Sequence, residues 1–409
     1  MIKKIISQFI YQFGNYILPF LIIPFLINKL SLETYKDFVV IQTLVIFFAV
    51  LVSYGLDLFG VRYVSSNWKV KRICKQFLYI SLISRIIIFL CCCILLFISL
   101  CVLTKYNITY WILCFFWLSS FVLQSNWYLQ GVGDFKFIAL YGLIPKLILY
   151  PFVFIFIHND RDAWIYLLLC GLANYLSNII MFRHAMKSLD GVAFSSRRLG
   201  RKIWLFLRKG WYLFLSQASI TLISYANIFF LPLVLDAKSF VVFSTADRVV
   251  KVLSIATTPV LNVLFPYISS LIPCNKEKAF LLISRISLIS ILIFLFCYII
   301  YIMIGHHFVQ LLFPKIATQL YLVLLCLLFN VLFVFLNNLY GTQIGLNFGK
   351  DRIFSKIVAS NGLLSIMLMS AGGVMFSLNG VVISSLYVQI SILVCMYLLS
   401  KKCGYRFKV

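Results

Sequence analysis

The chain alternates long apolar stretches with short polar connections from its beginning to its end. A helix needs about 20 apolar residues to cross a hydrocarbon core that is ~30 Å thick. Stretches of this length predict twelve membrane-spanning helices, over residues 9–28, 38–60, 77–103, 109–129, 137–157, 163–183, 211–234, 240–265, 280–304, 319–340, 353–375 and 380–400. The pattern therefore predicts an all-α integral membrane protein.

The amino-acid composition agrees with this pattern. Hydrophobic residues make up 63% of the 409 residues, charged residues make up 11%, and the mean hydropathy is +1.03. These values exclude a soluble globular protein. The twelve cysteines include three in a row at 91–93 inside a predicted span, and they lack the paired spacing of a zinc site or a disulfide framework. We therefore expect them to be packing residues.

Lysine and arginine concentrate in every second connection. If the N-terminus lies in the cytosol, 25 of the 36 Lys and Arg residues lie on the cytosolic side, six lie outside and five lie within spans. Short cytoplasmic loops carry this excess in membrane proteins, so we expect both termini in the cytosol. The net charge of +25 then serves topology and contact with lipid headgroups, and no nucleic-acid partner is expected.

The longest polar connection, at about residues 184–210, divides the predicted spans six and six. It predicts a cytoplasmic linker between an N-terminal lobe, residues 1–195, and a C-terminal lobe, residues 196–409. Both lobes would have the same orientation, because each contains an even number of spans. Similar segments recur in the same order in both halves and favour an internal repeat: Ser7-Gln8 and Ser216-Gln217, PFL at 24–26 and LPL at 231–233, KDFVV at 36–40 and KSFVV at 238–242, VRYVSS at 61–66 and FPYISS at 265–270.

Two stripes of polar residues lie inside predicted spans at helical spacing. They are Gln8, Gln12 and Asn15 in the first span, and Gln217, Thr221 and Ser224 in the seventh. A polar group in hydrocarbon costs several kcal/mol unless it has a partner. These stripes are therefore expected to line a substrate cavity or to make hydrogen bonds between helices, and the sequence favours neither alternative.

Charged residues inside spans give a more specific signal, because a charge at the bilayer centre costs at least ~2.5 kcal/mol. Lys146 lies near the middle of the fifth predicted span. Asp247 and Lys251 in the eighth span have the i, i+4 spacing of a helical ion pair. Such a pair leaves Arg248 to bind an anionic group, and a phosphate suits the guanidinium best, although a backbone carbonyl is the alternative partner.

Three other charged residues, Asp57, Arg85 and Arg285, lie near the cytosolic ends of their predicted spans, where they are expected to extend toward the headgroups. The chain has no phosphate-binding loop, no Ser/His/Asp set and no metal-ligand spacing. No connection on the outer side is long enough to form a catalytic domain. We therefore expect a protein that is not an enzyme and has no cofactor or metal.

Three segments resemble the Wzx-type flippases of polysaccharide repeat units, a family of the multidrug, oligosaccharidyl-lipid and polysaccharide exporter superfamily. They are YGLDLFGVRYVSS at 54–66, QSNWYLQGVGDFKFIAL at 124–140, and the stretch at 216–271 that contains Ala246-Asp247-Arg248 and Pro266-Tyr267. The pattern departs from the family at Ser31, where a glycine is expected in a turn. The resemblance implies about twelve helices in two pseudo-symmetric six-helix lobes around a central cavity.

The same resemblance implies a function in the bacterial inner membrane. The family translocates undecaprenyl-diphosphate-linked oligosaccharides for O-antigen or a related surface polysaccharide, as part of lipopolysaccharide biosynthesis. Arg248, Lys251 and Lys146 would then bind the diphosphate, with Asp247 as an ion-pair or coupling residue, and the amide stripes would bind sugar hydroxyls. Polysaccharide polymerase and chain-length proteins would be partners. The sequence does not identify a coupling ion, H⁺ or Na⁺.

Two other functions remain open at this point. A multidrug antiporter of the same superfamily would be expected to carry several carboxylates inside its spans, whereas cations outnumber acids there in this chain. A membrane-embedded polymerase or glycosyltransferase would need acidic residues on an outer loop, and only short loops such as HNDRDA at 158–163 are present. The charge balance thus favours an anionic, lipid-linked substrate.

Overall fold

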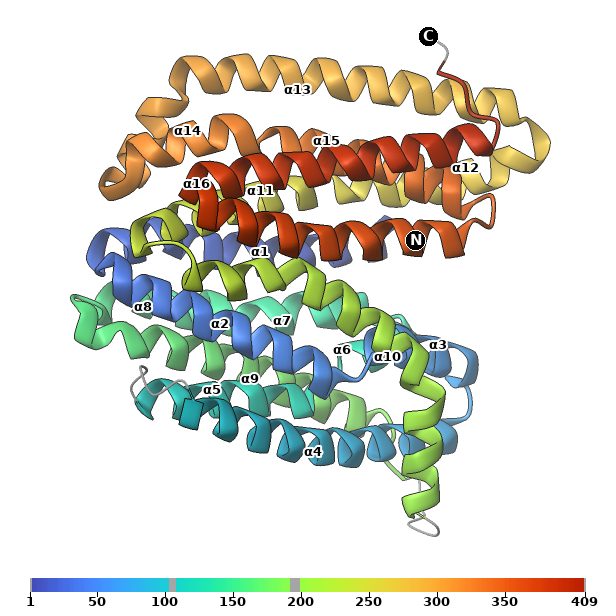
Figure 1. Cartoon of the computed structure of the whole chain (residues 1–409). Helices are drawn as coiled ribbons and strands as arrows, with labels where there is room; N and C mark the ends of the chain where they lie inside the picture. The colour runs from blue at the N-terminus through green and yellow to red at the C-terminus, as the bar shows by residue number, and fades with distance from the viewer. Residues whose placement is uncertain (1, 103–107, 192–198, 408–409) are drawn as a thin grey trace. The chain divides into compact units, whose positions relative to one another are not determined.

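The computed structural model describes residues 2–102, 108–191 and 199–407, and in these residues the chain forms helices and no strand (Figure 1). It is an all-helical integral membrane protein. The chain packs as two compact units, Met1–Tyr225 and Ala226–Val409. The lobe boundary expected at residues 195/196 stays a prediction. It was placed so that six predicted spans lie on each side, whereas the two compact units are defined by which residues pack together.

The first unit contains the helices α1 to α9 and most of α10. Their bounds are α1 Ile2–Lys29, α2 Leu32–Ser53, α3 Leu56–Asn67, α4 Lys71–Val102, α5 Ile108–Ser120, α6 Asn126–Val132, α7 Phe135–Leu149, α8 Pro151–Phe156, α9 Ala163–Lys187 and α10 Leu199–Phe230, with short 3-10 turns η1 Phe121–Leu123 and η2 Asp160–Asp162. The closest packing joins α7 to α9, α5 to α9 and α1 to α7. These helices surround the polar cavity described below.

The second unit begins within α10 and runs to the C-terminal end. It contains η3 Leu231–Leu233, α11 Ala237–Ala256, α12 Thr258–Cys274, α13 Lys276–Leu312, η4 Pro314–Ile316, α14 Ala317–Leu327, α15 Phe329–Asn337, the π-helix η5 Asn338–Leu346 and α16 Asp351–Lys402. Its core gathers buried apolar residues of α12, α13, α15, η5 and α16. Both FVV segments of the predicted repeat, 38–40 and 240–242, are buried, each in its own unit.

Several predicted spans are interrupted in the structure. The second, expected over 38–60, ends at Ser53 and resumes at Leu56, because Tyr54 and Gly55 have left-handed backbones with φ of 47° and 65°. A Cβ atom on Gly55 would lie 2.9 Å from the backbone nitrogen of Phe214. The break therefore needs glycine both for its conformation and for the close approach of α10.

The predicted linker at 184–210 is too long. Helix α9 continues to Lys187, and α10 has already begun at Leu199. The first turns of α10 pack on the first unit, since Phe206 is buried, Tyr54 donates to the Leu207 carbonyl at 2.9 Å, and the rings of Tyr54 and Phe214 stack 4.6 Å apart. The prediction failed because it weighted the lysines and arginines of this segment and overlooked its apolar residues at helical spacing.

In the described residues, eight helices are long and apolar enough to cross a membrane, and a shorter apolar helix covers Gly14–Lys29. The count of twelve spans stays a prediction. One of the eight, α16, covers both of the last two predicted spans. It folds back on itself where Phe376 and Ser377 leave the helical conformation, and Figure 1 shows its two halves side by side.

Two glycines allow the halves of α16 to approach each other. A Cβ atom on Gly372 would lie 2.7 Å from the carbonyl oxygen of Gly380, and the Ser384 hydroxyl donates to the Leu368 carbonyl at 3.0 Å. Small residues permit this kind of backbone approach between membrane helices. The reversal is thus fixed by packing as well as by the non-helical residues at its tip.

We expect Gly372→Ala to lower the free energy of unfolding by about 1 to 3 kcal/mol, because the added methyl group has no room beside Gly380. Equilibrium unfolding in mixed micelles with increasing SDS would measure the change. Gly200→Ala is a matched control: this glycine is also helical, but nothing lies within 4 Å of an added Cβ. The control should be neutral or slightly stabilising, and equal effects at both positions would contradict the packing argument.

Candidate functional site

A polar cavity of about 410 Å³ lies inside the first unit, between α1, α2, α5, α7 and α9. Lys146 reaches it from α7, where it follows Pro145, a residue that cannot donate a hydrogen bond within the helix. The Lys146 Nζ atom donates to Asn15 Oδ1 at 2.6 Å. Two residues predicted separately, 131 positions apart in the chain, therefore meet at one site.

Six amide side chains line this cavity. They are Asn15, Gln42, Gln124, Asn126, Asn174 and Asn178, joined by the aromatic residues Tyr11 and Tyr150. Three amide NH₂ groups are bound within the walls: Asn126 donates to the Tyr11 hydroxyl at 2.7 Å, Asn174 to the Cys170 carbonyl at 3.0 Å and Asn178 to the Ser120 carbonyl at 2.9 Å. Amide groups of this kind suit an ammonium group, as the Asn15 oxygen binds Lys146, or the hydroxyl groups of a sugar.

Arg85 supports the wall of this cavity from α4. Its side chain has no exposed area, so the expectation that it extends toward the headgroups is wrong. It donates to the backbone carbonyls of Phe121, at 3.2 Å, and Gln124, where the chain is interrupted between α5 and α6. Carbonyls at a helix break must be satisfied inside the membrane. The guanidinium shares this role with the Gln124 backbone nitrogen, which donates to the Phe121 carbonyl at 3.2 Å, and with the Trp127 indole, which donates to the Gln124 carbonyl at 3.1 Å. Together they fix Gln124 at the cavity.

The second unit carries the predicted charged group on α11. Lys251 Nζ lies 2.7 Å from the Asp247 carboxylate, which confirms the i, i+4 ion pair. Arg248 is half-buried on the same helix, one position from Asp247. Asp236 caps the start of α11 by accepting from the backbone nitrogen of Ser239 at 3.2 Å. A cap at this end fixes where the helix begins and hence where its charged turn lies.

The remaining predicted site residues are less informative. Gln217 and Thr221 are half-buried on α10. The side chains of Gln8, Gln12 and Ser224 lie outside the described residues. The structure therefore brings Lys146 and Asn15 together, places Asp247 and Lys251 in contact, and leaves the roles of all ten predicted site residues as predictions.

Sequence reasoning missed amides in both units. Asn126 and Asn178 belong to the first cavity, and in the second unit Asn330 donates to the Ser385 hydroxyl at 3.1 Å, while Gln343 donates to the Leu261 carbonyl at 2.9 Å. Both side chains are buried within unit two. Amides that recur along the tenth predicted span were a usable signal, because a buried amide in a membrane helix needs a partner on another element.

Comparison with known sequences gives relatives over most of the chain. The profile of the family described as "Polysaccharide biosynthesis protein" matches residues 1–272. A "Putative O-antigen transporter" of Escherichia coli K12 is 23% identical over 393 residues, which cover 95% of this chain and 93% of that protein. A protein of the same description from Shigella dysenteriae is 25% identical over 275 residues, covering 66% and 68%.

Solved structures of similar fold are MATE transporters. An inward-facing multidrug resistance transporter of the MATE family, from the MOP superfamily, has a TM-score of 0.70 at 13% identity and covers 97% of this chain and 95% of its own. A mutant of the Vibrio cholerae MATE transporter VcmN has a TM-score of 0.64 at 15% identity and covers 98% and 96%. At these identities the likeness concerns the fold alone. The match to the family profile covers well over half of the chain, and the chain accordingly belongs to the polysaccharide biosynthesis protein family.

Proposed function

We propose that this protein is a flippase that translocates undecaprenyl-diphosphate-linked oligosaccharides, the repeat units of O-antigen or a related surface polysaccharide. The observation that carries the proposal is the partly buried contact of Lys146 with Asn15 in a cavity of a membrane protein that six amide side chains help to line. Placing a cation and many polar groups inside a membrane protein costs free energy, and packing of the helices could be achieved without them. Their presence therefore favours a binding function. Membership of the family and the relatives named as O-antigen transporters support a transporter rather than an enzyme.

The charged group on α11 and the polar cavity of the first unit suggest a division of roles. Arg248 offers the planar donor pair that matches a phosphate, and Lys251 adds a second cation on the same face of α11 while its partner Asp247 limits the local charge. The amide oxygens and tyrosines of the first unit suit sugar hydroxyls. Lys146 would attract the diphosphate or an acidic sugar. Each role is open to a separate substitution.

The proposed location is the bacterial inner membrane, with both termini in the cytosol. The excess of Lys and Arg in alternate connections supports this orientation. It requires Asp160, between α8 and α9, to lie outside and Lys276, at the start of α13, to lie inside. Reporters active in only one compartment, fused at these positions, would reveal an inverted topology.

Deletion of the gene is expected to stop surface polysaccharide and to make undecaprenyl-diphosphate-linked oligosaccharide accumulate on the cytosolic leaflet. Mass spectrometry of extracted lipids would identify the accumulated molecule, and expression of the intact chain from a plasmid should reverse both effects. Unchanged polysaccharide together with new sensitivity to cationic drugs would contradict the proposal and favour an antiporter. Accumulation of single repeat units in the outer leaflet would instead indicate a polymerase.

A further inference from the structure

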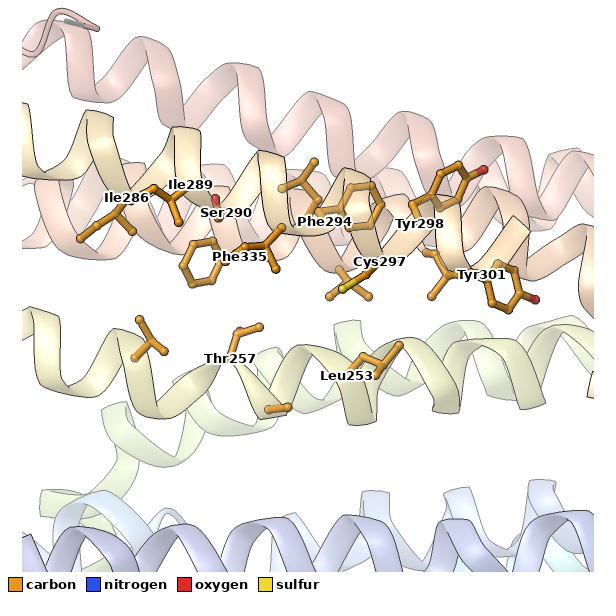
Figure 2. Close-up of a pocket in the computed structure, with 16 residues that line it drawn as sticks. Leu253, Thr257, Ile286, Ile289, Ser290, Phe294, Cys297, Tyr298, Tyr301 and Phe335 are labelled. Atoms are coloured by element: carbon orange, nitrogen blue, oxygen red, sulfur yellow. The ribbon is translucent and has the colours of Figure 1, made fainter. Parts of the chain in front are cut away.

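A long apolar groove of about 610 Å³ lies in the second unit, between α11, α12, α13 and α15. Its longest wall is one face of α13, formed by residues from Ile286 to Tyr301 that recur at intervals of three and four. Figure 2 shows Ser290, Phe294 and Cys297 on this wall, with Leu253 and Thr257 opposite them. The volume falls in the range of ~300–1,000 Å³ that is typical of ligand sites.

The hydroxyl groups along the groove are turned back into the protein. Ser290 donates to the Ser287 carbonyl at 2.8 Å, Thr257 to the Ser254 carbonyl at 2.7 Å and Tyr298 to the Leu325 carbonyl at 2.9 Å. Among the described residues the Tyr301 hydroxyl has no hydrogen-bond partner, and it lies at one end of the row. The length between Ile286 and Cys297 therefore offers a ligand no free donor, and a hydrocarbon chain is the chemistry that fits.

The length of the groove distinguishes two kinds of hydrocarbon chain. Tyr301 lies fifteen positions after Ile286, which corresponds to about 22 Å along a helix that rises 1.5 Å per residue. The acyl chains of one leaflet reach only half of a ~30 Å core, or about 15 Å. The groove is thus longer than a phospholipid chain that stays in its own leaflet, and it suits a chain that passes the bilayer midplane.

We propose that this groove binds part of the isoprenoid chain of the transported lipid. The proposal rests on the proposed function and adds a site for the lipid to the sites for the diphosphate and the sugars. Selectivity would come from shape, because a chain that leaves the bilayer for the groove exchanges one apolar environment for another. Aromatic side chains such as Phe294 and Phe335 supply rigid surfaces that match the methyl branches of an isoprenoid.

The test is photochemical labelling of the whole protein in phospholipid nanodiscs. One probe is undecaprenyl diphosphate with a diazirine in its isoprenoid chain, and the second is phosphatidylcholine with a diazirine in an acyl chain. We expect the first probe to label the α13 face between Ile286 and Tyr301, and excess unlabelled undecaprenyl diphosphate to suppress this label. Labelling of that face by both probes alike, without suppression, would identify bulk lipid and overturn the proposal.

Two variants make the test specific. Cys297→Trp fills the groove and should reduce labelling of this face by about tenfold, which corresponds to ~1.4 kcal/mol. Phe296→Trp is the matched control, because Phe296 is the adjacent residue, is 67% exposed and does not line the groove. If Cys297→Trp does not fold, Ser290→Phe narrows the same groove. Equal labelling of the groove variant and the control would contradict the proposal.

Failure of this inference is distinguishable from failure of the proposed function. If the deletion strain accumulates the lipid-linked oligosaccharide but the first probe never labels the α13 face, the protein is a flippase and the groove is not its lipid site. If the deletion strain accumulates nothing, the proposed function itself is wrong, whatever the labelling. A groove variant that loses its label should also export polymer more slowly at matched abundance.

Discussion

Arg248→Ala is expected to leave the protein in the membrane at normal abundance and to abolish export of polymer. The truncation removes the only side chain on this turn of α11 that can donate to a phosphate through two parallel hydrogen bonds. Arg248→Lys should restore part of the export, because it keeps the charge and loses the planar fork. Surface polysaccharide and accumulated lipid-linked oligosaccharide, compared at matched abundance, give the two measurements.

The neighbouring pair provides an internal comparison for this prediction. Lys251→Ala leaves the Asp247 carboxylate without the ammonium that lies 2.7 Å away, whereas Asp247→Asn combined with Lys251→Gln removes both charges and should be milder. Arg285→Ala is the control on α13, where the side chain is exposed. Full export by Arg248→Ala would exclude the diphosphate role. If the double variant exports less polymer than Lys251→Ala, Lys251 contacts the substrate directly.

Arg85→Met is expected to lower the free energy of unfolding by about 3 kcal/mol, the largest stability effect that we predict. The methionine fills similar space but removes the charged donor of both carbonyls, so that the Phe121 carbonyl keeps only the Gln124 backbone nitrogen as a donor and the Gln124 carbonyl only the Trp127 indole. A hydrogen bond to a charged group contributes about 1.5 to 3 kcal/mol. Equilibrium unfolding in mixed micelles with increasing SDS would measure the loss. The shape of the polar cavity should also be less well fixed, because Gln124 lines it.

A surface arginine serves as the control for this second prediction. Arg62 on α3 is exposed, and Arg62→Met should change stability by less than about 0.5 kcal/mol. Arg85→Lys separates charge from geometry, since an ammonium cannot donate to both carbonyls in the same fixed fork. An Arg85→Met protein as stable as the Arg62→Met protein would show that water or another group satisfies the break between α5 and α6.

The parts of the structure that depend on local sequence were predictable. Apolar length alone predicted an all-helical membrane protein, because the length that a span requires is set by the thickness of the bilayer, while the count of twelve spans stays a prediction. The pair Asp247 and Lys251 followed from their spacing on one helix. The start of α10 was predicted wrongly, because its charged residues indicate a linker. Its apolar residues Ile203, Phe206 and Leu207, at helical spacing, pack into the first unit.

The parts that depend on contacts between distant helices were not predictable. Nothing local to Lys146 indicates that Asn15 accepts from it, and nothing near Asn126 indicates Tyr11, which lies 115 positions away. The π-helix η5 is a second obstacle, because its wider turn changes which residues share a face, so the regular period of an α-helix does not locate Gln343. Gly55 in the sequence indicates that the helix can break there, but it does not indicate in which direction the chain continues.

The buried position of Arg85 has a consequence for the order in which the chain is made. The carbonyls that it binds belong to residues 36 and 39 positions later, so they do not exist when α4 leaves the ribosome. Until then the guanidinium offsets part of the favourable insertion energy of α4, by at most roughly 2.5 to 3.5 kcal/mol, the cost of an arginine at a helix centre. The arginine gains these partners only after the segment through Gln124 has followed, so one side chain couples the final packing of α4 to that of the break between α5 and α6.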